Sequence, residues 1–102
     1  NLDAILAAAE ARGLPTLLVP MQAPGNYGPD YKAAFDAIYP DLAAKHGDRI
    51  AGSFFAPLTT PLGGLRASDL MQPDGIHPSA TGIALIVEAI GPDVQSLLAE
   101  VK

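Results

Sequence analysis

The stretch Gly13–Pro20, with the sequence GLPTLLVP, joins an apolar helix to a buried strand and decides the fold class. Before it, apolar residues recur at helical spacing over residues 2–9 of an alanine-rich segment, and Gly13 is suited to end that helix. Residues 16–19 form a short, continuous apolar run, which is typical of a parallel strand buried on both faces. A helix that feeds such a strand through a short turn is half of a β-α-β unit, so the sequence predicts an α/β fold.

The loop at residues 20–29 follows this strand and is rich in Pro, Gly and Asn. In α/β proteins the binding residues lie on loops at the carboxyl ends of parallel strands. The position of this loop therefore favours the interpretation that it forms one wall of a substrate pocket. The alternative, that it only connects two elements, stays open.

An amphipathic helix is expected next, beginning at Pro29 and ending at Gly47. Its apolar side chains recur at helical spacing: Tyr31, Phe35, Ile38, Tyr39 and Leu42. Pro40 lies inside this pattern and is expected to kink or locally break the helix, because proline removes a backbone donor. Residues 49–52 are a weak candidate for a second strand.

The C-terminal part is expected to be irregular at residues 59–70 and helical after Ser79, which can act as an N-cap. The buried face of that helix is predicted from the spacing of Ile83, Ile86, Val87 and Ile90. We expect Gly91-Pro92 to end this helix and a separate amphipathic segment to follow it at residues 94–101.

Composition limits the classes of protein that the chain can belong to. The 102 residues carry six basic and eleven acidic side chains, so the basic patch that nucleic-acid binding requires is missing. The absence of cysteine excludes disulfides, thiolate metal sites and cysteine nucleophiles. No apolar run approaches the ~20 residues of a membrane-spanning helix, so no membrane span is expected. The hydrophobic fraction of 49% is high for a short chain, which indicates packing against further protein.

Asp74-Gly75-Ile76-His77-Pro78 is the stretch with the clearest chemistry. A carboxylate three residues from an imidazole on one loop can fix the tautomer and ring orientation that a general base needs. The alternative is a structural loop in which Asp74 caps backbone N–H groups and His77 is half-buried. The other histidine, His46, ends a charged helix, where a solvated position facing the helix dipole is expected. The spacing of the two histidines matches no metal-binding motif.

Two segments resemble the SGNH (GDSL-type) hydrolase family, in its branch of arylesterases, thioesterases and lysophospholipases. Asp74–Pro78 followed by a helix is similar to the C-terminal block of that family. Residues 21–40, with the runs MQAP, NYG and AIYP, are similar to the segment between its fourth strand and the following helix. The resemblance implies a flavodoxin-like, three-layer α/β/α sandwich with a parallel sheet, of which residues 1–102 are the C-terminal portion.

The resemblance also implies that part of the chemistry lies outside this chain. Family members carry a serine nucleophile in a Gly-Asp-Ser block and complete an oxyanion hole with a Gly and an Asn, and none of these blocks occurs here. The serines of the chain lack the flanking residues: Ser53, Ser68, Ser79 and Ser96. The implied partner is the N-terminal half of the same protein, the isolated chain is expected to be inactive, and the implied location is periplasmic or secreted.

By resemblance, His77 is the general base and Asp74 orients it, in a serine esterase or thioesterase that acts on small to medium acyl groups through an acyl-enzyme. Ile76, Pro24 and Tyr27 are expected to contact the substrate. No metal or cofactor is implied. Two alternatives stay open: a carbohydrate acetylesterase of the same family, and a non-catalytic binding module on the same fold.

Overall fold

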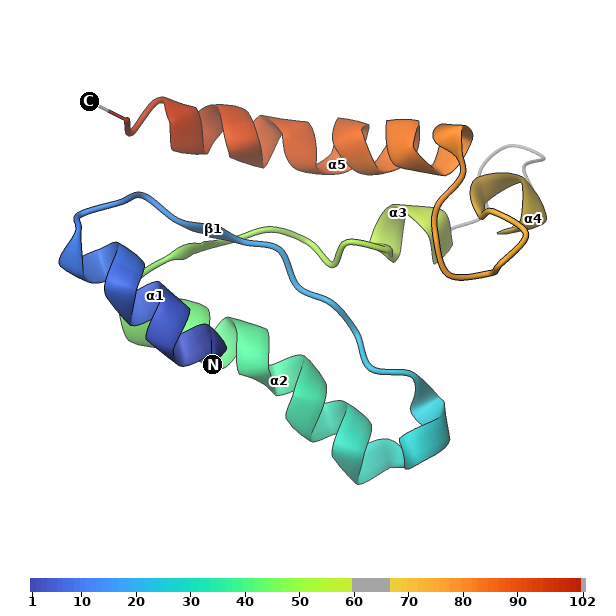
Figure 1. Cartoon of the computed structure of the whole chain (residues 1–102), viewed down its shortest axis with the longest axis horizontal. Coiled ribbons are helices and arrows are strands. Elements are labelled where there is room, and N and C mark those ends of the chain that lie inside the picture. The colour runs from blue at the N-terminus through green and yellow to red at the C-terminus, as the bar shows by residue number, and fades with distance from the viewer. Residues whose placement is uncertain (60–66, 102) are drawn as a thin grey trace.

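A small parallel sheet lies between two layers of helices (Figure 1). The computed structural model describes residues 1–59 and 67–101. Helices α1 (Leu2–Ala11) and α2 (Pro29–His46) lie on one side of the strands, and α5 (Ala80–Leu98) lies on the other. These described residues also form three short helical elements, η1 (Gly25–Tyr27), α3 (Ala56–Thr59) and α4 (Ala67–Leu70).

The two strands confirm the predicted α/β class. Strand β1 (Leu17–Leu18) pairs with β2 (Arg49–Ile50) in parallel, with Leu17 opposite Arg49 and Leu18 opposite Ile50. A parallel pair needs a crossover connection, and α2 supplies it. The weak strand predicted at residues 49–52 is therefore confirmed at its first two positions.

The turn from α1 to β1 depends on a left-handed glycine. Gly13 has a φ of +65°, and the N–H groups of Gly13 and Leu14 donate to the carbonyls of Glu10 at 2.9 Å and Ala9 at 3.1 Å. This pair of hydrogen bonds is a common way to end a helix at a residue with positive φ. The turn directs the chain back toward α2. Leu6 of α1, Leu18 of β1 and Ala43 of α2 then form a buried cluster.

Both long helices continue through an internal proline. The predicted helix end at Gly91-Pro92 is wrong, because α5 runs on to Leu98, and α2 is a single helix through Pro40. The less exposed residues of α5 explain its continuation, since they form one stripe that includes Gly82, Ile86, Ile90, Asp93 and Leu97. Their spacing of three or four residues carries the same packed face past Pro92, and this packing outweighs the hydrogen bond that the proline removes.

The other apolar side chains of α5 are exposed. Ile83 and Val87 are 43% and 58% exposed, so the predicted buried face is wrong for these two residues, while Ile86 is buried at 2%. Within the described residues, α5 is the one helix long and apolar enough to cross a membrane, with a mean hydropathy of 1.2 and 11% of it buried. Core helices of water-soluble proteins meet the same criterion of length and composition, so the expected lack of a membrane span stays a prediction.

The segment predicted to be irregular is partly helical. Thr59 ends α3 and residues 67–70 form α4, so the prediction is wrong at both ends of that segment. Residues 60–66, which carry the rest of it, lie outside the described part of the chain.

The core is small for the length of the chain. The radius of gyration is 15.5 Å, against about 13 Å for a compact domain of this length. The buried apolar residues in the described part are Leu6, Leu18, Ala23, Ala43, Ala51, Leu70 and Ile86. Large apolar side chains on both helical layers remain exposed, among them Ile5 at 65% and Leu98 at 62%.

Candidate active site

The loop that carries Asp74 and His77 is closed by backbone hydrogen bonds. Met71 and Pro78 form an isolated antiparallel bridge, and the N–H of Gln72 donates to the carbonyl of His77 at 2.7 Å. Gly75 at the tip has a φ of +68°. A residue with a Cβ adopts that conformation only at a cost of roughly 1–2 kcal/mol, so glycine is what lets the chain reverse between the acid and the histidine.

The carboxylate of Asp74 accepts three hydrogen bonds. Its Oδ1 accepts from the backbone N–H groups of Ile76 at 2.9 Å and His77 at 3.0 Å, and its Oδ2 lies 2.6 Å from Nδ1 of His77. The bond from the imidazole, followed by those from the two N–H groups, lowers the pKa of Asp74 from 3.8 to about 2. Because an ionised carboxylate can only accept, the proton of the neutral imidazole lies on Nδ1, which leaves Nε2 as a proton acceptor.

The imidazole of His77 faces outward. The side chain of His77 is 67% exposed, so the structural alternative is wrong about a half-buried ring, while its expectation that Asp74 caps backbone N–H groups is confirmed. Among the described residues, no hydrogen bond reaches its Nε2. The pair predicted from the sequence is therefore brought together, and its free nitrogen is accessible from outside the chain.

The start of α5 fixes the position of this loop. Ser79 donates its N–H to the carbonyl of Leu70 at 2.9 Å and its hydroxyl to the carbonyl of Asp69 at 2.7 Å. Its Oγ also accepts the N–H of Gly82 at 3.1 Å, so the predicted N-cap is confirmed. Gly82 packs so closely here that a Cβ on it would lie 2.2 Å from the carbonyl oxygen of Leu70. The close approach of Gly82 to Leu70 joins the end of α4 to the start of α5, on the two sides of the Asp74 loop in the sequence.

The three residues expected to contact substrate lie on two loops. Ile76 is in the Asp74 loop and is 68% exposed, while Pro24 and Tyr27 follow β1. Both loops lie beyond the carboxyl ends of the strands, at the right-hand end of Figure 1. In the described part of the chain, no hydrogen bond or ring contact joins Pro24 or Tyr27 to the Asp74 loop, and the ring of Tyr27 instead packs 5.2 Å from that of Tyr31.

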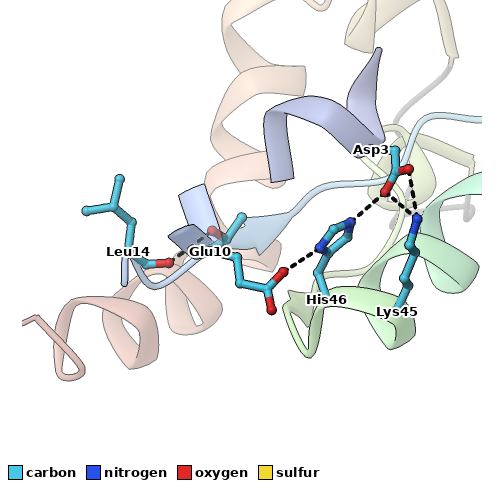
Figure 2. Close-up of polar contacts among 6 residues, drawn as sticks. Asp3, Glu10, Leu14, Lys45 and His46 are labelled. Atoms are coloured by element: carbon cyan, nitrogen blue, oxygen red, sulfur yellow. Dashed lines mark hydrogen bonds and ion pairs between the residues drawn. The ribbon is translucent and has the colours of Figure 1, made fainter. Parts of the chain in front are cut away.

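The prediction of a solvated His46 is wrong. Its side chain is 5% exposed and lies between two carboxylates of α1, with Nδ1 2.8 Å from Glu10 and Nε2 2.6 Å from Asp3 (Figure 2). Lys45 also binds the carboxylate of Asp3, at 2.8 Å. Only a doubly protonated imidazole donates to both acids, and the hydrogen bonds to Glu10 and then Asp3 raise the pKa of His46 above 6.5. These four residues, the α1–α2 clasp, hold the two helices together.

The clasp predicts a stability that falls as the pH rises. Because the pKa of His46 is raised above 6.5 in the folded chain, its contribution is fully present below that pH and is lost as the pH rises through the raised pKa. The variant His46→Gln cannot titrate, and both N–H donors of its amide are on one nitrogen, so it cannot bridge two carboxylates that face different ring nitrogens of His46. We expect it to lower the free energy of unfolding of the full-length protein more at about pH 6 than at about pH 9, measured with urea. An equal loss at both pH values would show that the imidazolium is not what joins the helices.

A pocket of about 250 Å³ lies beside the clasp, at the amino ends of both strands. Its walls include Glu10, His46, Asp48, Arg49 and Glu100. Four of these are already paired, since Nε of Arg49 donates to Glu100 at 2.7 Å and His46 pairs with Glu10 in the clasp. Ligands of parallel sheets bind at the carboxyl ends of the strands, so this pocket is at the wrong end to serve the Asp74 loop.

Proteins of known activity match the chain over nearly its whole length. No family profile matches it. It is 34% identical over 98 residues to the esterase TesA of Pseudomonas aeruginosa, covering 96% of this chain and 46% of that protein. It is 31% identical over 98 residues to the thioesterase 1/protease 1/lysophospholipase L1 of Escherichia coli K12, covering 96% of this chain and 44% of that protein. The chain thus spans about half the length of the relatives it matches.

Solved structures agree with the sequence comparison. The crystal structure of TesA matches with a TM-score of 0.73 at 33% identity, covering 94% of this chain and 50% of that one. AlinE4, an SGNH-hydrolase family esterase, matches with a TM-score of 0.63 at 35% identity, covering 95% of this chain and 48% of that one. By sequence and by fold, the chain is similar to esterases of the SGNH hydrolase type and spans about half the length of the proteins it matches.

Proposed function

We propose that this chain is the C-terminal portion of a serine esterase or thioesterase, in which His77 is the general base and Asp74 orients it. The observation that carries the proposal is the 2.6 Å contact between Oδ2 of Asp74 and Nδ1 of His77, on a loop that also fixes the carboxylate through two N–H groups. The similarity to an esterase and to a thioesterase supports an acyl carbonyl as the reacting group. Small to medium acyl groups and a periplasmic or secreted location stay predictions.

In the proposed reaction, Nε2 of His77 accepts the proton of a serine hydroxyl while the serine oxygen attacks the acyl carbonyl. The imidazolium then returns that proton to the leaving alcohol or thiol, and the same base later activates the water that hydrolyses the acyl-enzyme. Asp74 remains ionised throughout, since its pKa is lowered to about 2, and it stabilises the imidazolium as it forms.

The serine is proposed to lie outside residues 1–102. In the described part of the chain no serine is hydrogen-bonded to His77, and Ser79 is occupied in capping α5. The exposed apolar side chains of the sheet and of α5 support packing against further protein, as in Ile50 at 42% and Val87 at 58% exposure. The proposed partner is the N-terminal portion of the same protein, so we expect the isolated chain to be inactive.

The variant Asp74→Asn in the full-length protein tests the proposal. An amide side chain cannot hold the Nδ1 tautomer and stabilise the imidazolium as a carboxylate does, so kcat for a p-nitrophenyl ester should fall about 10²–10⁴-fold. The matched control is Asp41→Asn, which removes an exposed carboxylate of α2 and should leave kcat unchanged. Equal kcat values for the wild type and Asp74→Asn would exclude the proposed role of the pair.

A further inference from the structure

Two side chains of α2 hold the backbone of the loop that follows β1. The N–H of Ala23 donates to Oδ1 of Asp36 at 2.9 Å, and its carbonyl accepts from Nζ of Lys32 at 3.1 Å. Nζ of Lys32 also lies 2.6 Å from Oδ2 of Asp36. The three residues thus form a closed cycle of hydrogen bonds, which we call the Ala23 ring. In it, the Lys32–Asp36 ion pair provides hydrogen-bond partners for both the backbone N–H and the backbone carbonyl of Ala23.

The Ala23 ring differs from an ordinary pair of charges on a helix surface because the backbone groups that it holds belong to a buried residue. Ala23 is 5% exposed, and the side chains of Lys32 and Asp36 are 39% and 30% exposed. The hydrogen bond from Lys32, followed by that from Ala23, lowers the pKa of Asp36, so Asp36 is an anion at neutral pH. Hydrogen bonds with an ionised partner are about twice as strong as neutral ones, and opening the ring would leave buried backbone groups without partners.

An aromatic contact anchors the other end of the same loop. The ring of Tyr27 lies 5.2 Å from that of Tyr31, which lies 6.2 Å from that of Phe35. Pro24 lies between the two anchors and has a φ of −64°, which its own ring restricts. The position of Pro24 relative to the strands is therefore set by α2 at both ends of the loop.

We propose that Lys32 and Asp36 are positioning residues that set the selectivity for the acyl group, by fixing Ala23–Tyr27 as a rigid wall of the acyl pocket. The inference rests on the proposed esterase function and on Pro24 and Tyr27 as substrate contacts. A fixed wall fits a short acyl group closely and excludes a longer one, and a difference of one methylene can change selectivity about tenfold or more. Since Asp74 and His77 lie on another loop, opening the Ala23 ring should change KM and selectivity much more than kcat.

Three variants of the full-length protein distinguish the effect of the hydrogen bonds to Ala23 from the effect of the Lys32–Asp36 ion pair alone. Asp36→Ala opens the ring, while Asp36→Asn keeps an oxygen that can accept the N–H of Ala23. The exchange variant, Lys32→Asp with Asp36→Lys, keeps the ion pair, but lysine cannot accept from the N–H and aspartate cannot donate to the carbonyl. The measurements are kcat and KM for p-nitrophenyl acetate, butyrate and octanoate, and amide hydrogen exchange over residues 21–28.

For Asp36→Ala and the exchange variant, we expect the ratio of kcat/KM for acetate to that for octanoate to fall about tenfold, mainly through KM. Their amides at residues 21–28 should exchange faster, while Asp36→Asn should stay within about twofold of the wild-type ratio. An unchanged ratio in the exchange variant, beside a wild type that hydrolyses esters, overturns this inference and leaves the proposed function standing. A wild type that hydrolyses no ester overturns both. If Asp36→Ala does not fold, the other two variants decide the matter.

Discussion

Replacement of His77 by alanine is expected to lower kcat of the full-length protein for p-nitrophenyl butyrate by at least about 10³-fold, with KM little changed. The variant removes the one nitrogen that is oriented by Asp74 and open to a proton donor, and a serine hydroxyl is a weak nucleophile without such a base. The residues proposed to contact the substrate are untouched, so binding should persist. Steady-state kinetics at neutral pH measure both constants.

The second histidine supplies a matched control for this experiment. His46 is buried in the α1–α2 clasp at the other end of the sheet, so His46→Gln should keep kcat close to the wild-type value. Free imidazole that enters the space vacated by the side chain of His77 should restore part of the activity of His77→Ala but none of it in an Asp74→Asn variant. A His77→Ala protein with wild-type kcat would exclude His77 as the base.

Replacement of Gly82 by alanine is expected to lower the free energy of unfolding by about 3 kcal/mol, the upper end of the range for overpacking. The new methyl group would lie 2.2 Å from the carbonyl oxygen of Leu70, which is backbone and cannot rotate away. Relief of this clash must separate α4 from α5, and the Ser79 hydrogen bonds to Asp69 and Leu70 would be stretched. Urea unfolding of the full-length protein measures the loss, and kcat should fall because the Asp74 loop is anchored at the same place.

Gly91 is the control for Gly82 within the same helix. A Cβ at Gly91 meets nothing within 4 Å. Alanine favours the helix over glycine by about 0.5–1 kcal/mol, while its Cβ is crowded by the ring of the following Pro92, so Gly91→Ala should change the free energy of unfolding by less than about 1 kcal/mol. Equal destabilisation by the two variants would show that the close approach of Gly82 to Leu70 does not hold α5 in place.

The elements that the sequence predicts well are those set by local signals. The turn at Gly13, the start of α2 at Pro29 and the N-cap at Ser79 each depend on a residue with a strong local preference, and all three are confirmed. Pro92 shows the limit of such signals. Its local preference favours a helix end, but the packed stripe of α5 continues on both sides of it, and only the tertiary structure reveals that stripe.

Contacts between distant segments could not be predicted from spacing. Lys32 and Asp36 form an i,i+4 pair that is typical of a solvated helix face, and nothing in the sequence indicates that Ala23 closes the ring. His46 pairs with two acids more than thirty positions earlier in the chain, so the sequence alone suggested a solvated side chain. The Asp74–His77 pair was predictable because both partners lie on one short loop.

The most direct test of the account is to treat the full-length protein with a serine-directed phosphonate and to locate the labelled peptide by mass spectrometry. We predict a label on a serine outside residues 1–102, attached much more slowly when His77 is replaced by alanine. A label on Ser53, Ser68, Ser79 or Ser96, or a labelling rate that does not depend on His77, would contradict it.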